Sequence, residues 1–243
     1  MGNPIAAMLV IGDEILSGRT RDANMHHLAG ELGSAGIDLN EVRIVADDRA
    51  AIIQAARSLS AAFDHLFTSG GIGPTHDDIT ADCIAEAFGA PIDVRDDARA
   101  ILEAHYEAQK TTLNDARLRM ARIPDGATLI DNPISAAPGF TLGNVHVLAG
   151  VPSVFQAMVA SVLPTLTGGQ PISSSSLRIE RAEGEIAGPL AEIAEQYDQL
   201  SFGSYPFHQN GIYGTNIVVR GSDSSAVKMA ILVLQEAFLD ATA

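Results

Sequence analysis

The stretch TSGGIGPTHDDITAD, residues Thr68 to Asp82, contains three glycines, a proline, a histidine and three aspartates. A glycine has no Cβ, so its backbone can approach an anion closely and can adopt a positive φ. Successive amides in such a loop form a concave nest, and the start of a following helix adds partial positive charge. Gly70, Gly71 and Gly73 are placed for this role, whereas the G-K-[ST] and G-x-G-x-x-G signatures are absent from the loop.

The paired carboxylates of Asp77 and Asp78 would repel a bare phosphate. They favour a phosphate that arrives with a divalent cation, because Mg²⁺ typically uses one or two carboxylates together with substrate oxygens. The alternative is that Asp78 or Thr80 only caps the helix that follows. The spacing alone leaves both interpretations open.

The segments before and after this loop predict alternating strands and helices. Short apolar runs predict strands and apolar stripes at helical spacing predict helices. The expected elements are strands at 6–11, 38–45 and 65–69 and helices at 24–34, 49–63 and 80–88. This order predicts an α/β fold with a mostly parallel sheet covered by helices. In such sheets ligands bind beyond the carboxyl ends of the strands, so we expect Gly12-Asp13-Glu14 and Gly70-Gly71 to share one rim.

The second half of the chain predicts a change of architecture. Further elements are helices at 96–109 and 113–122, a strand at 146–149 and a helix at 154–162. The segment 167–176, TGGQPISSSS, is small, polar and uncharged, as linkers are. Beyond it the pattern predicts a small α+β unit of order β-α-β-β-α. The expected domains are therefore residues 1–168 and 175–243.

The charge balance restricts the partners. The formal net charge is −15, and Lys110 and Lys228 are the only lysines. Nucleic acid is not expected as a partner, because phosphate backbones are bound by clustered lysine and arginine. No apolar run approaches the roughly 20 residues that cross a bilayer, and the N-terminus lacks the basic start of a secretory signal, so we expect a cytoplasmic protein. A phosphorylated small ligand would have to be held by backbone amides, a few arginines or a metal ion.

A few other side chains have both a functional and a structural interpretation. Arg19 and Arg21 follow the first loop and could clamp a phosphate or lie on the surface. His76 could donate to a phosphate oxygen or be an ordinary loop histidine. The single cysteine, Cys83, lies in an apolar helical pattern and is interpreted as inert core.

Taken together, these segments resemble the molybdopterin-binding domain family, which includes MogA, MoaB and the N-terminal region of CinA. FTSGGIGPTHDDIT at 67–80 is similar to the family's signature, and IGDEILSGRTRDAN at 11–24 and IVADDRAAI at 44–52 are similar to its first two segments. IPDGATLIDNPISAAPGF at 123–140 and GVPS at 150–153 are similar to later segments, and FGSYPF at 202–207 resembles the small extra domain of CinA-like chains.

The resemblance implies a three-layer MogA/MoaB-like α/β domain, a small α+β domain and a set of site residues. By motif position, Asp78 and Asp47 match the family's catalytic aspartates, with Asp77 and Asp78 as the expected metal ligands. The matched ligand-binding positions are Gly12, Asp13, Glu14, Ser69, Gly70, Gly71, Gly73, Pro74, Thr75, Gly150, Pro152 and Ser153.

The implied function is the binding of a phosphorylated nucleotide or pterin with a divalent metal, Mg²⁺ or Co²⁺, in a homo-oligomer. The resemblance to CinA-like chains favours metal-dependent cleavage of a diphosphate such as ADP-ribose or FAD over MogA-like adenylyl transfer to molybdopterin. We do not expect the C-terminal amidohydrolase domain of CinA in this protein, nor its deamidation activity. Family members often have P-G-V-P-S-E-M where this chain has AGVPSVF at 149–155. This departure motivates the alternative of a non-catalytic molybdopterin- or nucleotide-binding module.

Overall fold

The computed structural model describes residues 2–239 and divides the chain into two compact units. The first unit ends at Gly169 and the second begins at Gln170. Within residues 2–239, no helix is both long and apolar enough to cross a bilayer.

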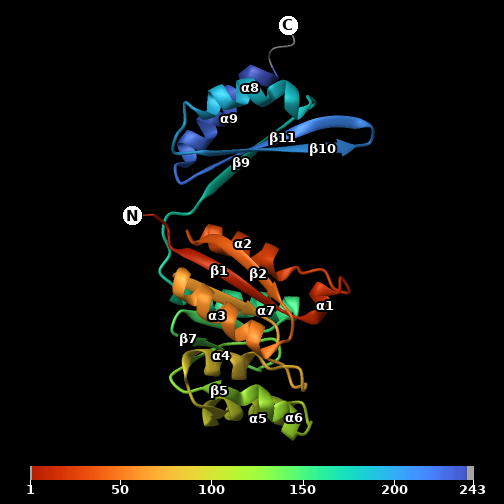
Figure 1. The fold of residues 1–243 in the computed structure, drawn as a ribbon, viewed down its shortest axis with the longest axis vertical. Coiled ribbons are helices and arrows are strands. Elements are labelled where there is room, and N and C mark those ends of the chain that lie inside the picture. Colours follow the sequence, from red (N-terminus) through yellow and green to blue (C-terminus); the bar gives the residue numbers. More distant parts are fainter. Residues whose placement is uncertain (1, 240–243) are drawn as a thin grey trace. The chain divides into compact units, whose positions relative to one another are not determined.

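The first unit is built on a six-stranded sheet of order β2-β1-β3-β8-β7-β6 (Figure 1). β1 pairs in parallel with β2 and β3, β3 pairs in parallel with β8, and β6 and β7 add an antiparallel edge. The strands are β1 Ile5–Ile11, β2 Asp38–Val45, β3 His65–Ser69, β6 Thr128–Ile130, β7 Gly139–Leu142 and β8 Val145–Leu148. The mostly parallel α/β sheet expected from the sequence is confirmed.

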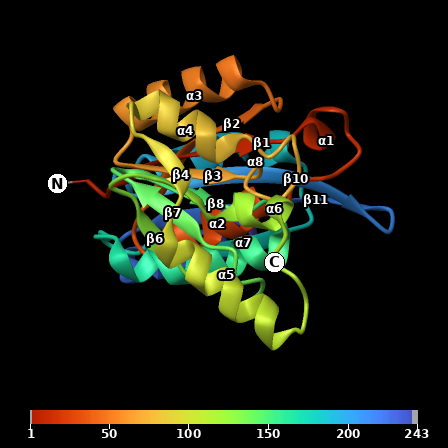
Figure 2. The same ribbon diagram turned by 90° about the horizontal axis from the view of Figure 1, so that it is seen from below.

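Helices cover both faces of this sheet and make three layers. Figure 2 shows α3 and α4 on one side of β1 and β3, and α2 and α7 on the other. The helices and short helical turns of the unit are α1 Asp13–Leu16, α2 Asn24–Ser34, α3 Arg49–Ala62, α4 Thr80–Phe88, α5 Asp96–Ala108, α6 Asp115–Leu118, η1 Arg119–Ala121, α7 Pro152–Val162 and η2 Leu163–Thr165.

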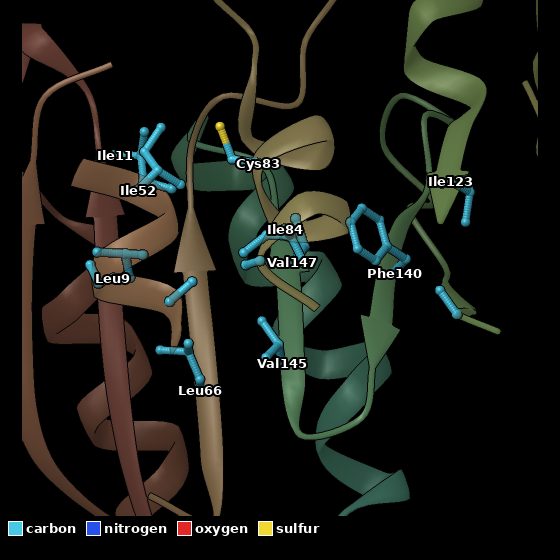
Figure 3. Close-up of a cluster of buried hydrophobic side chains, with 14 of the residues drawn as sticks. Leu9, Ile11, Ile52, Leu66, Cys83, Ile84, Ile123, Phe140, Val145 and Val147 are labelled. Carbon is cyan, nitrogen blue, oxygen red and sulfur yellow. The ribbon is translucent and has the colours of Figure 1, made fainter. Parts of the chain in front are cut away.

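Two apolar clusters hold the layers together because neighbouring residues of a strand face opposite sides. Leu9, Leu66 and Val147 point toward α3 and α4 (Figure 3), and Met8 and Phe67 pack with α2 and α7. Cys83 is fully buried in the first cluster. Burial raises the pKa of its thiol to about 11, so the inert-core interpretation of the cysteine agrees with the structure.

The segment 113–122 is not one helix as predicted. Asn114 caps the short α6, η1 follows, and the chain then enters β5 Arg122–Pro124, which pairs antiparallel with β4 Ile92–Val94. Residues 115–121 are therefore helical, but as two short pieces, and only Arg122 of the predicted helix is drawn into β5 by its pairing with Val94.

The second unit is a three-stranded antiparallel sheet of order β10-β11-β9 with two helices. Its elements are β9 Ser173–Ile179, α8 Glu183–Ala194, β10 Ser201–Gln209, β11 Ile212–Gly221 and α9 Ser224–Phe238. The predicted β-α-β-β-α order is confirmed. Ser173–Ser176, which were assigned to the linker, belong to β9, because pairing with Val218–Gly221 of β11 supplies the strand that four serines do not indicate.

Candidate functional site

The candidate site lies where β1, β3 and β8 end, at the carboxyl edge of the parallel strands. Backbone hydrogen bonds hold the loops at this edge together: Gly12 N donates to Val45 O at 3.1 Å, and Gly70 N donates to Leu148 O at 3.2 Å. The first loop and the glycine loop therefore share one rim, as the strand order requires.

The glycine loop requires glycine at two successive positions. Gly70 and Gly71 have φ values of 106° and 71°, a region that side chains rarely adopt. A Cβ on Gly70 would lie 2.3 Å from Ile11 O, and one on Gly71 would lie 2.1 Å from Thr80 Oγ1. The loop therefore packs directly against the end of β1 and the start of α4, which no larger residue would allow.

Part of the loop's hydrogen-bonding capacity remains available to a ligand. Thr75 N donates to Asp78 Oδ2 at 2.8 Å, and Thr80 N donates to Gly71 O at 2.9 Å. Within the described residues, the amides of Gly71, Ile72 and Gly73 have no hydrogen-bond acceptor. All three residues line a pocket, so these amides can serve an anion there.

Asp78 shapes the loop and does not cap a helix. Its Oδ2 accepts hydrogen bonds from the amide and the hydroxyl of Thr75. A Cβ on Gly73 would lie 2.6 Å from the same oxygen. The N-cap residue of α4 is Ile79, and no side chain caps that helix. The alternative in which Asp78 or Thr80 caps α4 is therefore wrong.

Asp47 enters the site because its neighbour performs the capping role. Asp48 Oδ1 accepts from Ala51 N at 2.8 Å and caps α3. Asp47 Oδ2 instead accepts from Asp13 N at 2.9 Å, which ties the end of β2 to the first loop. The Glu14 carboxylate folds back over Gly12, where a Cβ would lie 2.5 Å from its Oε2.

These loops surround a pocket of about 460 Å³. The matched positions that line it are Gly12, Glu14, Asp47, Gly70, Gly71, Gly73, Pro74, Asp77, Asp78 and Gly150. Ser69 and Pro152 line an adjoining cavity of about 60 Å³. Asp13 and Thr75 contribute amides to Asp47 and Asp78 instead of lining the pocket, and Ser153 lies in the first turn of α7 without lining either space.

One wall of the pocket was not singled out from the sequence. It consists of Asn132, Ser135 and Ala137, in the loop between β6 and β7. Asn132 is 3% exposed; its Nδ2 donates to Ser135 Oγ and Ala137 O, and its Oδ1 accepts from two loop amides. The Asn-Pro pair at 132–133 was an available turn signal.

Asn24 was also missed. Its Nδ2 donates at 2.8 Å both to Ser69 Oγ and to Gly150 O. The side chain is 3% exposed, and its bonds link the ends of β3 and β8 at the adjoining cavity. Nothing in the helical pattern of 24–34 distinguishes this asparagine from an ordinary first-turn residue.

The pocket is acidic. Among the described residues that line it, Glu14, Asp47, Asp77 and Asp78 are carboxylates and none is lysine, arginine or histidine. The Thr75 hydroxyl donates its single hydrogen to Asp78. An anionic ligand therefore needs a compensating cation to enter.

The carboxylates do not form a complete metal site by themselves. Within residues 2–239, no three or more histidine, cysteine, aspartate or glutamate side chains group closely enough to hold a metal ion. A dispersed set of one or two carboxylates fits Mg²⁺ that keeps water and phosphate oxygens as its remaining ligands. The donors present thus fit a cation that binds together with a phosphorylated ligand.

Comparison with known protein families gives two matches that together cover most of the chain. Residues 7–168 match the family described as "Probable molybdopterin binding domain". Residues 171–242 match the family described as "FAD synthase, middle domain". The family predicted from the sequence for the first unit is therefore confirmed.

Individual relatives agree with both matches. A probable FAD synthase of Caenorhabditis elegans is 30% identical over 256 residues, which cover 95% of this chain and 49% of that protein. The chain spans about half the length of several curated relatives that it matches. A protein of Pyrococcus furiosus is 31% identical over 242 residues, covering 93% of this chain and 94% of its own length.

A solved structure supports the fold. The crystal structure of CinA from Thermoplasma acidophilum, a protein described as having unknown function, superposes with a TM-score of 0.61. It is 32% identical in sequence and covers 66% of this chain and 98% of its own.

Proposed function

Because the chain belongs to the molybdopterin-binding domain family, we propose that its pocket binds a phosphorylated nucleotide or pterin and hydrolyses a nucleotide diphosphate linkage of the ADP-ribose or FAD type. The single observation that carries this proposal is the juxtaposition of acceptor-free amides at Gly71–Gly73 with the carboxylates of Asp47, Asp77 and Asp78 around one pocket. The relatives named probable FAD synthase favour a nucleotide over a pterin as the ligand.

Each part of the pocket has a distinct role in this proposal. The amides of Gly71, Ile72 and Gly73 bind oxygens of one phosphate. Asp78, with Asp77 or Asp47, holds a divalent ion, Mg²⁺ or Co²⁺. Such an ion would neutralise charge that develops on the diphosphate and would make a bound water more acidic.

The reaction adds one water across the P–O–P bridge. The water oxygen bonds to one phosphorus, and the bridging oxygen leaves with the other phosphate. ADP-ribose would give AMP and ribose phosphate, and FAD would give AMP and FMN. MogA-like adenylyl transfer to molybdopterin would use the same amides and carboxylates with a different acceptor.

A second candidate is a binding module without turnover, and the start of α7 favours it. Val154 lines the pocket and Phe155 is fully buried in the core, where related sequences often carry Glu-Met. An acidic side chain is thus replaced by an apolar one at the pocket wall.

The test is incubation of the purified protein with ADP-ribose, FAD or ATP, in Mg²⁺ or Co²⁺ and in chelator, with chromatographic detection of AMP. The hydrolase proposal expects AMP in the presence of metal and none in chelator. Tight binding of a nucleotide or pterin without any AMP would contradict hydrolysis and support the binding module.

A further inference from the structure

One arginine beside the glycine loop was not singled out from the sequence. Arg119 lies in η1, and its Nη2 is 3.5 Å from Asp78 O, within the loop. It lines a small depression of about 20 Å³ together with Gly71, Ile72, Gly73 and Asp78. These four residues also line the main pocket, so the depression and the pocket adjoin along the same loop.

Arg119 differs from the arginines around it in having no carboxylate partner. Arg122 pairs with Asp82 and Asp93, and Arg49 pairs with Glu86. Throughout the described part of the chain, Arg119 makes no ion pair. Its side chain is exposed, and its charge is not neutralised by the fold.

The other arginines considered for phosphate binding are placed less well. Arg21 lines the adjoining cavity and not the main pocket, and Arg19 lines neither space. The main pocket offers four carboxylates and no basic group among its described lining residues. Arg122 also lines the depression, but it is paired with Asp82. For a diphosphate with one phosphate on the loop amides, Arg119 is therefore the basic side chain beside the loop whose charge is not already paired.

We propose that Arg119 binds the diphosphate of the ligand, donating from its guanidinium to phosphoryl oxygens at the edge of the glycine loop. The class of ligand rests on the proposed function. Arginine suits this role because its planar fork can donate two parallel hydrogen bonds to a phosphate and remains charged at any physiological pH. Arg119 would then supply positive charge to the diphosphate directly, whereas the carboxylates would supply it through a bound metal ion.

The experiment is calorimetric titration of ADP-ribose, with Mg²⁺, into the wild type and into Arg119→Ala, Arg119→Lys and Arg99→Ala. Hydrogen bonds to charged groups contribute roughly 1.5–3 kcal/mol, so Arg119→Ala should weaken ADP-ribose binding about tenfold to a hundredfold. Arg119→Lys should recover part of the affinity. Arg99→Ala is the matched control, because Arg99 pairs on the surface with Glu103 and lines no pocket.

Two results would overturn the assignment. One is an ADP-ribose affinity of Arg119→Ala equal to that of the wild type. The other is a fall in affinity accompanied by a lower melting temperature of the free protein and no recovery with lysine, which would indicate a structural role.

The outcomes for Arg119 and for hydrolysis are separate. If ADP-ribose binding depends on Arg119 but the wild type releases no AMP, the hydrolysis proposal is rejected and the binding role of Arg119 is supported. If Arg119→Ala releases AMP as fast as the wild type, hydrolysis is supported and the role of Arg119 is rejected. A wild type that binds no ADP-ribose would reject both.

Discussion

At the scale of single residues, Asp78 is both a structural and a proposed metal-binding group. One of its oxygens accepts two hydrogen bonds from Thr75 and fixes the loop. Its other oxygen, Oδ1, accepts no hydrogen bond from any residue that the structure describes. The fold thus uses half of the carboxylate and leaves the other half for a ligand.

The substitution Asp78→Asn separates these two roles. An asparagine retains an oxygen for Thr75 N but loses the negative charge that would hold a divalent ion. We expect metal-dependent AMP release from ADP-ribose to fall by about 10²-fold or more, with an unchanged far-UV circular dichroism spectrum. Activity equal to that of the wild type would remove Asp78 from the mechanism.

Substitution of Gly71 tests whether this position requires a residue without a side chain. Gly71→Ala places a Cβ at positive φ and 2.1 Å from Thr80 Oγ1. Gly143→Ala is the control, because Gly143 also has a positive φ, 61°, but open space around its Cβ position. In urea denaturation we expect a loss of about 1 kcal/mol for Gly143→Ala and roughly 2–4 kcal/mol for Gly71→Ala. Equal losses would mean that the contact with Thr80 is relieved without cost.

At the scale of elements, the loop between β6 and β7 forms a wall of the pocket through one buried asparagine. Its backbone turns through Ala136 at φ 63°, an uncommon conformation for a residue with a side chain. The four hydrogen bonds of Asn132 hold this turn. Without them, the backbone of this wall would have alternatives of lower strain.

Asn132→Ala should therefore affect both stability and ligand binding. We expect a loss of roughly 1–3 kcal/mol of unfolding free energy and a weaker affinity for ADP-ribose. Asn144→Ala is the matched control: Asn144 donates to Ser60 O and Phe63 O and accepts from Ser60 Oγ, but it lines no part of the pocket. Urea denaturation should show comparable losses, and calorimetry should show weaker binding only for Asn132→Ala. A similar affinity of Asn132→Ala and Asn144→Ala for ADP-ribose would show that the loop between β6 and β7 does not contribute to ligand binding.

The elements also show what the sequence could and could not predict. Strand β3 and helices α2 and α4 were predicted to the residue, since glycines and apolar periodicity mark their limits locally. Ser173–Ser176 failed because pairing with a distant strand determines their conformation. The helix predicted at 113–122 is present only as two short helical pieces over 115–121. Of the site, the glycines and aspartates were recognisable, because their chemistry is unusual in sequence. Asn24 and Arg119 were not, because their contacts span 41 to 126 positions of the chain. The contacts of Asn132 are local, but a turn signal does not show that the turn lines the pocket.

At the scale of the whole molecule, two neighbouring histidines link stability to pH. His146 Nδ1 lies 3.0 Å from Thr141 Oγ1, and its Nε2 lies 3.3 Å from His65 Nδ1. Burial, together with the smaller effect of the neighbouring His65, lowers the pKa of His146 from 6.5 to about 4. Burial also lowers the pKa of His65. Both side chains are therefore neutral in the folded protein at neutral pH.

The sign of the pH effect follows from this depression. Between pH 6.5 and about 4 the unfolded chain binds a proton at His146 and the folded protein does not, so stability falls as the pH decreases. We expect His146 to contribute a loss of roughly 3 kcal/mol across this range. Urea denaturation at several pH values should show that the free energy of unfolding decreases less in His146→Gln than in the wild type. The decrease should be the same as in the wild type for His76→Gln, because His76 is exposed. Parallel curves for the wild type and His146→Gln would contradict the expectation.

The central claim about the molecule is that backbone amides and a carboxylate-held cation bind a diphosphate in a pocket without basic lining residues. The most direct measurement is a ¹⁵N–¹H NMR titration of the labelled protein with α,β-methylene-ADP, a diphosphate analogue that is not hydrolysed, in Mg²⁺. The claim predicts that the analogue causes large chemical shift changes of the Gly71, Ile72 and Gly73 amide signals in the presence of Mg²⁺. In chelator the analogue should cause no such changes. Binding of the analogue that leaves these three signals in place would contradict it.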